Sequence, residues 1–185
     1  MTRTVLPVAL LALVVSLTPA TRASAQTPKF EQPVLVTSAG QSAEVTIAGM
    51  LFKKAEIPVK VAPQAKVADL EGQKTLVVAP GFSSKGLGSA GIDKDQEMGR
   101  VKALIAAAQK AKMPILVLHL GGKPRRGAQS DEFNKVVGAA ATYLIVVKAG
   151  DEDQFFTKLA GERKIPIELV DRMSDATGPI GKLFK

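Results

Sequence analysis

Two adjacent arginines, Arg125 and Arg126, are the side chains in this sequence best suited to bind a ligand. They lie near the end of the segment 119–127, which also contains the chain's single histidine and the pair Gly121-Gly122. Guanidinium groups bind carboxylates and phosphates through paired, charge-assisted hydrogen bonds. Glycines leave the backbone N–H groups free to approach an anion. The segment therefore predicts a binding site for an anionic ligand.

The sequence leaves the roles of these side chains open. His119 suits either a general base or a buried, hydrogen-bonded residue at the end of a strand. The two arginines cannot both be assumed to face a ligand, so one of them could instead form a structural ion pair. The acidic residues available for such a pair are Asp131, Asp151, Glu152 and Asp153.

Two further loops, rich in Gly and Ser, are expected to join the same site. Segment 38–42 (SAGQS) precedes a predicted helix, whose free N–H groups and positive end favour an anion, although Ser42 could simply be an N-cap. Segment 81–91 contains four glycines and could wrap a ligand, act as a lid or serve only as a flexible connection. The predicted ligand-binding residues are Ser38, Gly40, Gln41, Ser42, Ser83, Ser84, Lys85, Gly86, His119, Gly121, Gly122, Arg125 and Arg126.

Several kinds of chemistry are excluded by motif and inventory. Gly86, Gly88 and Gly91 match G-x-G-x-x-G, but residues intervene between the preceding strand and this motif, and no acid ends the next strand, so a dinucleotide site is rejected. The G-x-S-x-G spacing of a nucleophile elbow fails at Lys85. With one histidine and no cysteine, neither a His-cluster nor a thiolate metal site can form, and we expect no metal and no cofactor.

The composition indicates one ordinary globular domain. The chain has 185 residues, of which 46% are hydrophobic, and no cysteine, which argues against disorder and against a disulfide scaffold. Its 25 Lys and Arg exceed 17 Asp and Glu, but no run of five basic residues occurs and there is one Tyr and no Trp. Nucleic acid is therefore not an expected partner.

The first residues predict a signal peptide. Arg3 precedes the apolar segment 5–15, and Ala23-Ser24-Ala25 forms a small-x-small cleavage site. A membrane anchor is the alternative, but the segment is shorter than the ~20 residues of a spanning helix, and no later segment qualifies. We assign 1–25 to the signal peptide, 26–32 to a leader and 33–185 to a single α/β domain. The mature protein is expected in the periplasm or outside the cell, without membrane insertion.

Six short apolar runs alternate with segments of helical periodicity. The unbroken Val, Ile and Leu content of most runs is typical of strands buried on both faces, which predicts a doubly wound, three-layer α/β fold with a mostly parallel six-stranded sheet. The runs are 34–37, 59–61, 75–78, 115–118, 144–147 and 167–170. The longer helical segments between them are 43–55, 96–112, 130–140 and 151–164, with short ones at 65–70 and 174–184.

The order of the strands is predicted from the loops. In the flavodoxin-like order, 2-1-3-4-5, the first and third strands are neighbours at the switch point, whereas the Rossmann order is 3-2-1-4-5-6. The loops richest in Gly and Ser follow the first and third runs. This placement favours the flavodoxin-like order, because ligands of such sheets bind beyond the carboxyl ends of the strands at that point.

Several of these segments together resemble a family of uncharacterised α/β domains of secreted bacterial proteins, a domain of unknown function. The resemblance runs through 34–42, 85–92, 119–127, 130–131, 143–148 and 155–156. It implies an extracytoplasmic α/β domain and brings with it no established activity. No catalytic or binding residue can be carried over from the family.

Three functions compete at this point. The favoured one is an exported binding module for a small anionic molecule bearing a carboxylate or a phosphate. The second is a hydrolase or transferase with His119 as general base and Ser38 or Ser83 as nucleophile, which lacks a recognisable triad order. The third is a non-enzymatic interaction protein of an envelope or transport complex. The sequence leaves open whether the protein catalyses a reaction. It favours a protein without catalytic activity.

The predicted cleavage site gives a direct test of the export hypothesis. The mature protein should begin at or near Gln26, since the small residues at 23 and 25 fit a signal peptidase site. N-terminal sequencing of protein collected outside the cytoplasm checks this expectation. An intact Met1 on the exported protein would end the signal-peptide hypothesis.

Overall fold

All six apolar runs form strands of one parallel sheet in the computed structural model, which describes Met1 and residues 30–184. The sheet order is β2-β1-β3-β4-β5-β6. β1 pairs with β3 along its whole length, from Val34 opposite Thr75 to Ala39 opposite Pro80. This confirms the flavodoxin-like order over the Rossmann order. The strands are β1 (Val34–Ala39), β2 (Val59–Val61), β3 (Thr75–Pro80), β4 (Ile115–His119), β5 (Tyr143–Val147) and β6 (Ile167–Val170).

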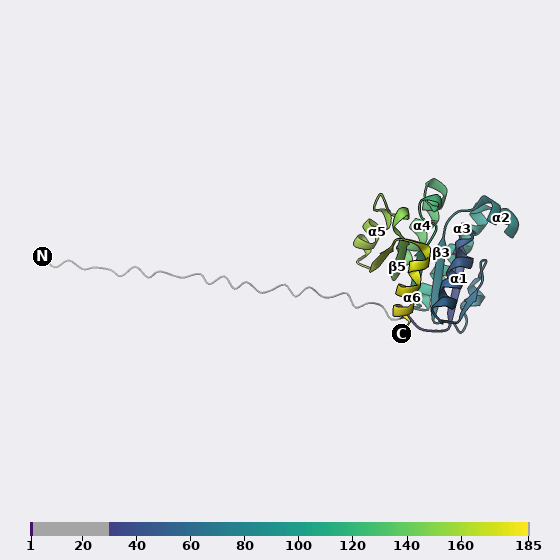
Figure 1. The fold of residues 1–185 in the computed structure, drawn as a ribbon, viewed down its shortest axis with the longest axis horizontal. Coiled ribbons are helices and arrows are strands. Elements are labelled where there is room, and N and C mark those ends of the chain that lie inside the picture. Colours follow the sequence, from purple (N-terminus) through teal and green to yellow (C-terminus); the bar gives the residue numbers. More distant parts are fainter. Residues whose placement is uncertain (2–29, 185) are drawn as a thin grey trace.

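Helices cover both faces of the sheet (Figure 1). α1 and α6 pack on one face, and α3, α4 and α5 pack on the other. The helices are α1 (Glu44–Lys54), α2 (Ser84–Ala90), α3 (Lys94–Lys110), α4 (Ala128–Ala140), α5 (Phe155–Arg163) and α6 (Thr177–Leu183). Four 3₁₀ turns complete the domain: η1 (Val67–Leu70), η2 (Lys123–Arg125), η3 (Lys148–Gly150) and η4 (Met173–Ala176).

Most of the predicted export signal lies outside the described residues. Apart from Met1, the signal peptide 1–25 is not described, nor are residues 26–29 of the leader. Within the part of the chain that is described, none of the helices has the length and hydropathy of a membrane-spanning segment.

Two apolar cores, one on each side of the sheet, stabilise the domain. Along β1, Val34 and Val36 face α1, whereas Leu35 and Ala39 face α3, because successive side chains of a strand point to opposite faces. Each large side chain buried in this way contributes roughly 1.5–3 kcal/mol. The same alternation puts Ser38 on the α1 face of the sheet.

A similar alternation places the histidine on the other side. In β4, Leu116 and Leu118 belong to the α1-side core, and Ile115 and Val117 belong to the α3-side core. His119, the next residue along, therefore faces the α3, α4 and α5 side, where its ring lies 4.6 Å from that of Phe156. Ser38 and His119 thus lie near the same carboxyl edge of the sheet but on opposite faces of it.

The glycine-rich segment 81–91 is more ordered than the sequence predicts. It forms the helix α2, which stands out from the rest of the ribbon (Figure 1). The Ser83 hydroxyl caps this helix by accepting a hydrogen bond from the N–H of Gly86 at 3.0 Å, and Gly91 ends it with φ 68°. Well-formed caps at both ends stabilise a short helix despite its glycine content.

Two glycines of α2 give a matched pair of tests. A β-carbon at Gly86 would overlap the carbonyl of Gln41, whereas nothing lies within 4 Å of the equivalent position at Gly88. Gly86→Ala should lower the free energy of unfolding by more than about 1 kcal/mol through overpacking. Gly88→Ala should raise it by about 0.5–1 kcal/mol, because alanine favours the helix.

Urea unfolding of both variants measures the difference. Equal effects of the two substitutions would show that α2 does not rest against the 38–42 loop in solution.

Candidate functional site

Arg125 lies across the switch point of the sheet, where the loops after β1, β3 and β4 meet. Its Nε donates to Oε1 of Glu44, in the first turn of α1, at 2.9 Å, and Nη1 donates to the carbonyl of Phe82 at 3.2 Å. The stem of the side chain packs over Gly81 and Gly121, where a β-carbon would meet it at 3.0 Å or overlap it. Both positions therefore require glycine as long as the Arg125 side chain packs across them.

Glu44 is an anion in this environment. Burial opposes its ionisation, but the neighbouring Ser42 hydroxyl and the Arg125 guanidinium outweigh that effect and keep the pKa of Glu44 below its ordinary value. Its side chain is only 10% exposed. The start of α1, where the sequence predicts an external anion, thus already holds a carboxylate of the chain itself.

Five buried polar atoms without a hydrogen-bond partner lie at or near this edge of the sheet. Such atoms are uncommon in folded proteins, since a buried polar group normally has a partner. Only Gln73, among the described residues, has a comparable atom elsewhere. The five are Oγ of Ser38, Oγ of Ser42, Oε2 of Glu44, Nδ1 of His119 and Oδ1 of Asn134.

The five atoms fall into two groups. Ser38, Ser42 and Glu44 belong to the α1 side, whereas His119 and Asn134 belong to the side of α4 and α5. The Ser42 hydroxyl helps to keep the pKa of Glu44 low, so it acts on that carboxylate. The first group therefore combines a carboxylate oxygen without a recorded hydrogen-bond partner and the guanidinium of Arg125.

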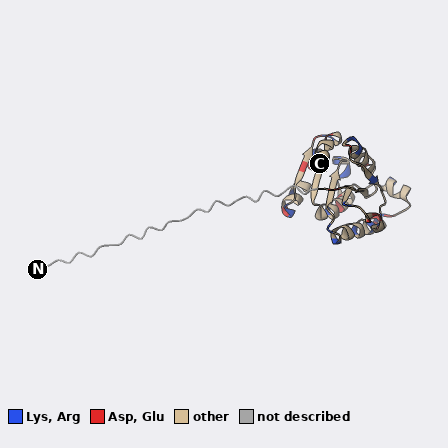
Figure 2. Cartoon of the chain, turned by 90° about the horizontal axis from the view of Figure 1, so that it is seen from below, with Lys and Arg blue, Asp and Glu red and all other residues tan. Residues whose placement is uncertain are grey.

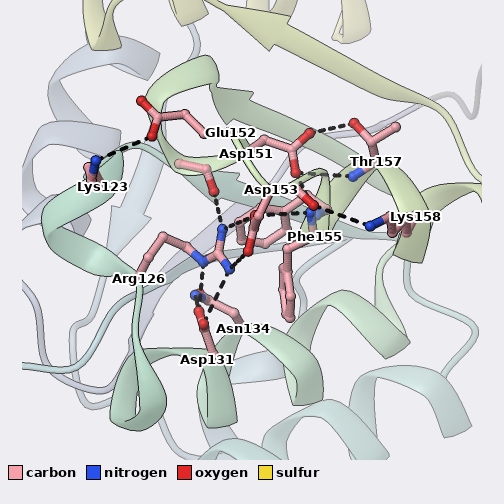
Figure 3. A network of polar contacts seen from close by, with 12 residues as sticks. Lys123, Arg126, Asp131, Asn134, Asp151, Glu152, Asp153, Phe155, Thr157 and Lys158 are labelled. Atoms are coloured by element: carbon pink, nitrogen blue, oxygen red, sulfur yellow. Dashed lines mark hydrogen bonds and ion pairs between the residues drawn. The ribbon is translucent and has the colours of Figure 1, made fainter.

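Arg126 is fully engaged by the protein. It donates to Asp131 at 2.7 Å and to Asp153 at 2.8 Å, and its guanidinium lies 4.5 Å from the centre of the Phe155 ring (Figure 3). Hydrogen bonding to Asp153 raises the pKa of Arg126, although partial burial opposes this. This is the structural ion pair that the sequence left open for one of the two arginines. Arg126 joins the loops after β4 and β5 and has little left to offer a ligand.

His119 is a fully buried residue of the core. Its Nε2 lies 3.3 Å from the carbonyl oxygen of Gly122, and burial lowers the pKa of the ring to about 4. Ser38 lies on the opposite face of the sheet with β3 between the two strands. Ser83, the other candidate nucleophile, caps α2. The described hydrogen bonds thus do not join His119 to either serine, as a nucleophile and its base would require.

Gly40 and Gln41 are held by a residue that the sequence analysis missed. The Gly40 N–H donates to Oε1 of Glu97 at 2.8 Å, and the Gln41 amide donates to the same oxygen at 3.1 Å. Glu97 is fully buried and pairs with Arg100, which also donates to the carbonyl of Ser38 at 2.6 Å. The sequence did carry a signal for the burial of Glu97. This residue falls on the apolar stripe of α3, four residues before Val101.

The remaining predicted residues lie on α2 and in the turn just before Arg125, where the carbonyl of Gly122 accepts from the Arg125 N–H. Ser84 and Lys85 are exposed on α2, and Gly86 rests against Gln41. Gly122 adopts φ 58° at the turn beside His119. Lys and Arg are spread over several helices (Figure 2). Of the basic residues predicted for the site, Arg125 is the one that bonds to Glu44 and to the loop after β3.

The chain belongs to a family described as a domain of unknown function, DUF6305, whose model matches residues 31–184. This confirms the resemblance to an uncharacterised domain family. A comparison with curated proteins finds no match.

Among solved structures the chain is similar to a GDSL-like lipase from Bacteroides thetaiotaomicron VPI-5482, with 12% identity and a TM-score of 0.32. The similarity covers 74% of this chain and 66% of the lipase chain, just under two thirds. AlinE4, an SGNH-hydrolase family esterase, has 12% identity and a TM-score of 0.31 over 85% of this chain and 82% of its own. Superposition at this level gives no correspondence between residues and assigns no activity to this chain.

Burial of His119 predicts a pH dependence of stability. The folded state favours the neutral ring, because the pKa of His119 is lowered from 6.5 to about 4. The unfolded chain therefore binds the extra proton first, and stability falls as the pH drops from 6.5 towards 4. The loss should reach on the order of 3 kcal/mol.

His119→Phe should remove this part of the pH dependence while keeping an aromatic ring beside Phe156. Chemical unfolding of the parent and the variant at several pH values between 4 and 7 measures it. If the two proteins lose stability in parallel over that range, the histidine is not the responsible group.

Proposed function

We propose that this protein is an exported, non-enzymatic binding domain for a small anion, and that Arg125 is its principal contact. The ligand would bear a carboxylate or a phosphate and would bind at the carboxyl ends of β1 and β3. This is the switch point at which parallel α/β sheets of this order bind their ligands. The observation that carries the proposal is the position of Arg125 at that point with part of its guanidinium unused.

Arg125 keeps hydrogen-bonding capacity for a ligand. Its recorded bonds use Nε and Nη1, and no described residue accepts from Nη2. Its side chain is 27% exposed, so the guanidinium is within reach of solvent. A charge-assisted hydrogen bond from this nitrogen to an anion would contribute about 1.5–3 kcal/mol.

Ser42 is a neighbour of Arg125 on the same side of the sheet. A β-carbon at Gly81 would lie 3.1 Å from the Ser42 hydroxyl and 3.0 Å from Cδ of Arg125. A ligand held by Arg125 would therefore lie close to the start of α1.

The location of the protein outside the cytoplasm and a partner protein are part of the proposal. The predicted signal peptide supports a location in the periplasm or outside the cell, and no cofactor is needed for binding alone. One domain of this size cannot enclose a ligand between two lobes. A partner protein of the envelope would provide the missing wall.

Replacing Arg125 tests the proposed function. The parent should gain thermal stability from phosphates or carboxylates, compared with chloride at the same ionic strength, because a ligand that binds the folded state stabilises it by about 2.7 kcal/mol at 100 times Kd. Arg125→Ala should lose this gain. Lys123→Ala should keep it, since Lys123 belongs to the same turn but is 77% exposed.

Two further observations keep the test clear. Arg125→Lys retains the charge without the planar fork and should recover part of the anion effect, which separates ligand binding from a general loss of fold. A parent protein that no anion stabilises would contradict the proposal and leave the interaction protein as the better hypothesis.

A further inference from the structure

We infer that the ligand of this site, if the proposed function holds, is an oxyanion that still carries a hydroxyl group, such as hydrogen phosphate, and that Glu44 accepts a hydrogen bond from this hydroxyl. The site would then bind phosphate and reject sulfate, which has the same tetrahedral shape and no hydroxyl at neutral pH. Glu44 becomes a specificity-determining residue.

The free oxygen of Glu44 is the first reason. Oε1 of this carboxylate is occupied by Arg125, but Oε2 is buried and has no hydrogen-bond partner. Glu44 as a whole is 8% exposed, so the lone pairs of Oε2 are largely withheld from bulk solvent. A buried carboxylate oxygen of this kind is stabilised by a group that donates a hydrogen bond.

The charge of Glu44 is the second reason. Its carboxylate is ionised and would repel any anion that approaches Arg125. A ligand with a hydroxyl avoids this repulsion, because the hydroxyl donates to Oε2 and forms a short, charge-assisted hydrogen bond. A fully deprotonated ligand has no such way to lie next to the carboxylate.

A donor beside Glu44 fits the other oxygens of the same ligand. Nη2 of Arg125 can donate to an oxygen that carries no proton. The site thus presents a donor next to an acceptor, and hydrogen phosphate offers acceptor oxygens together with one donor. Sulfate offers acceptors only, and so leaves Oε2 without a donor beside a second negative charge.

Titration calorimetry with inorganic phosphate and with sulfate, at pH 7.5 and matched ionic strength, tests this inference. The parent should bind phosphate at least tenfold more tightly than sulfate. Dimethyl phosphate, a phosphorus oxyanion without a hydroxyl, should bind as weakly as sulfate. A phosphate monoester, which at pH 7.5 is mostly the dianion without a hydroxyl on phosphorus, should also bind more weakly than inorganic phosphate.

Glu44→Gln should erase the discrimination. The amide presents an N–H donor where the carboxylate had an acceptor, so sulfate should bind more tightly and phosphate more weakly than in the parent. Glu132→Gln is the matched control, because Glu132 is half exposed and pairs with Lys94 on another part of the surface. Its preference should equal that of the parent.

The outcomes separate the two proposals. If the parent binds phosphate and sulfate equally, the inference about Glu44 fails while anion binding stands. If the parent binds neither ion and no other phosphate or carboxylate, the proposed function itself fails. The comparison of ions in the parent needs no variant, so the inference stays falsifiable even if Glu44→Gln does not fold.

Discussion

The ion pair between Arg125 and Glu44 determines which polar groups lie at the switch point on the carboxyl edge of the sheet. It links the turn after β4 to the start of α1 and spans the end of β3 between them. The stem of Arg125 reaches Glu44 only because Gly81 and Gly121 leave room for it. The pair places two charges of the protein at the switch point. One guanidinium nitrogen and one carboxylate oxygen of the pair have no hydrogen-bond partner among the described residues.

Two other arginines hold the same edge in a comparable way. Arg100 and Glu97 fasten the loop after β1, and Arg126 fastens the loop after β5 through Asp153. Arginine suits this task because its planar fork serves several acceptors at once. Most of the lysines among the described residues, in contrast, are exposed. The conformations of these loops are therefore fixed by long side chains that come from α3 and from neighbouring loops.

The sequence predicts the framework well, because each apolar run carries its own evidence for a buried strand, and loop composition favoured the correct strand order. The position of the candidate site, at the carboxyl ends of β1 and β3, follows from that order. The partners of the arginines do not, because an acid in the first turn of a helix, such as Glu44, equally complements the helix dipole. The separation of Ser38 from His119 depends on which face of the sheet each side chain points to. Strands buried on both faces lack the apolar–polar alternation from which this could be predicted. Asp151, another acid that the sequence offered to an arginine, instead accepts hydrogen bonds from the N–H groups of Phe156 and Thr157 at the start of α5.

A double-mutant cycle on the free protein tests the central claim, that Arg125 and Glu44 form a coupled pair at the switch point. Arg125→Met keeps the stem over Gly81 and Gly121 and removes the charge, and Glu44→Gln removes the opposite charge. Unfolding of the parent, both single variants and the double variant at low salt and pH 7 should give a favourable coupling of about 1–3 kcal/mol. Effects that add within about 0.5 kcal/mol would show that the two residues do not interact, and would contradict this account of the site.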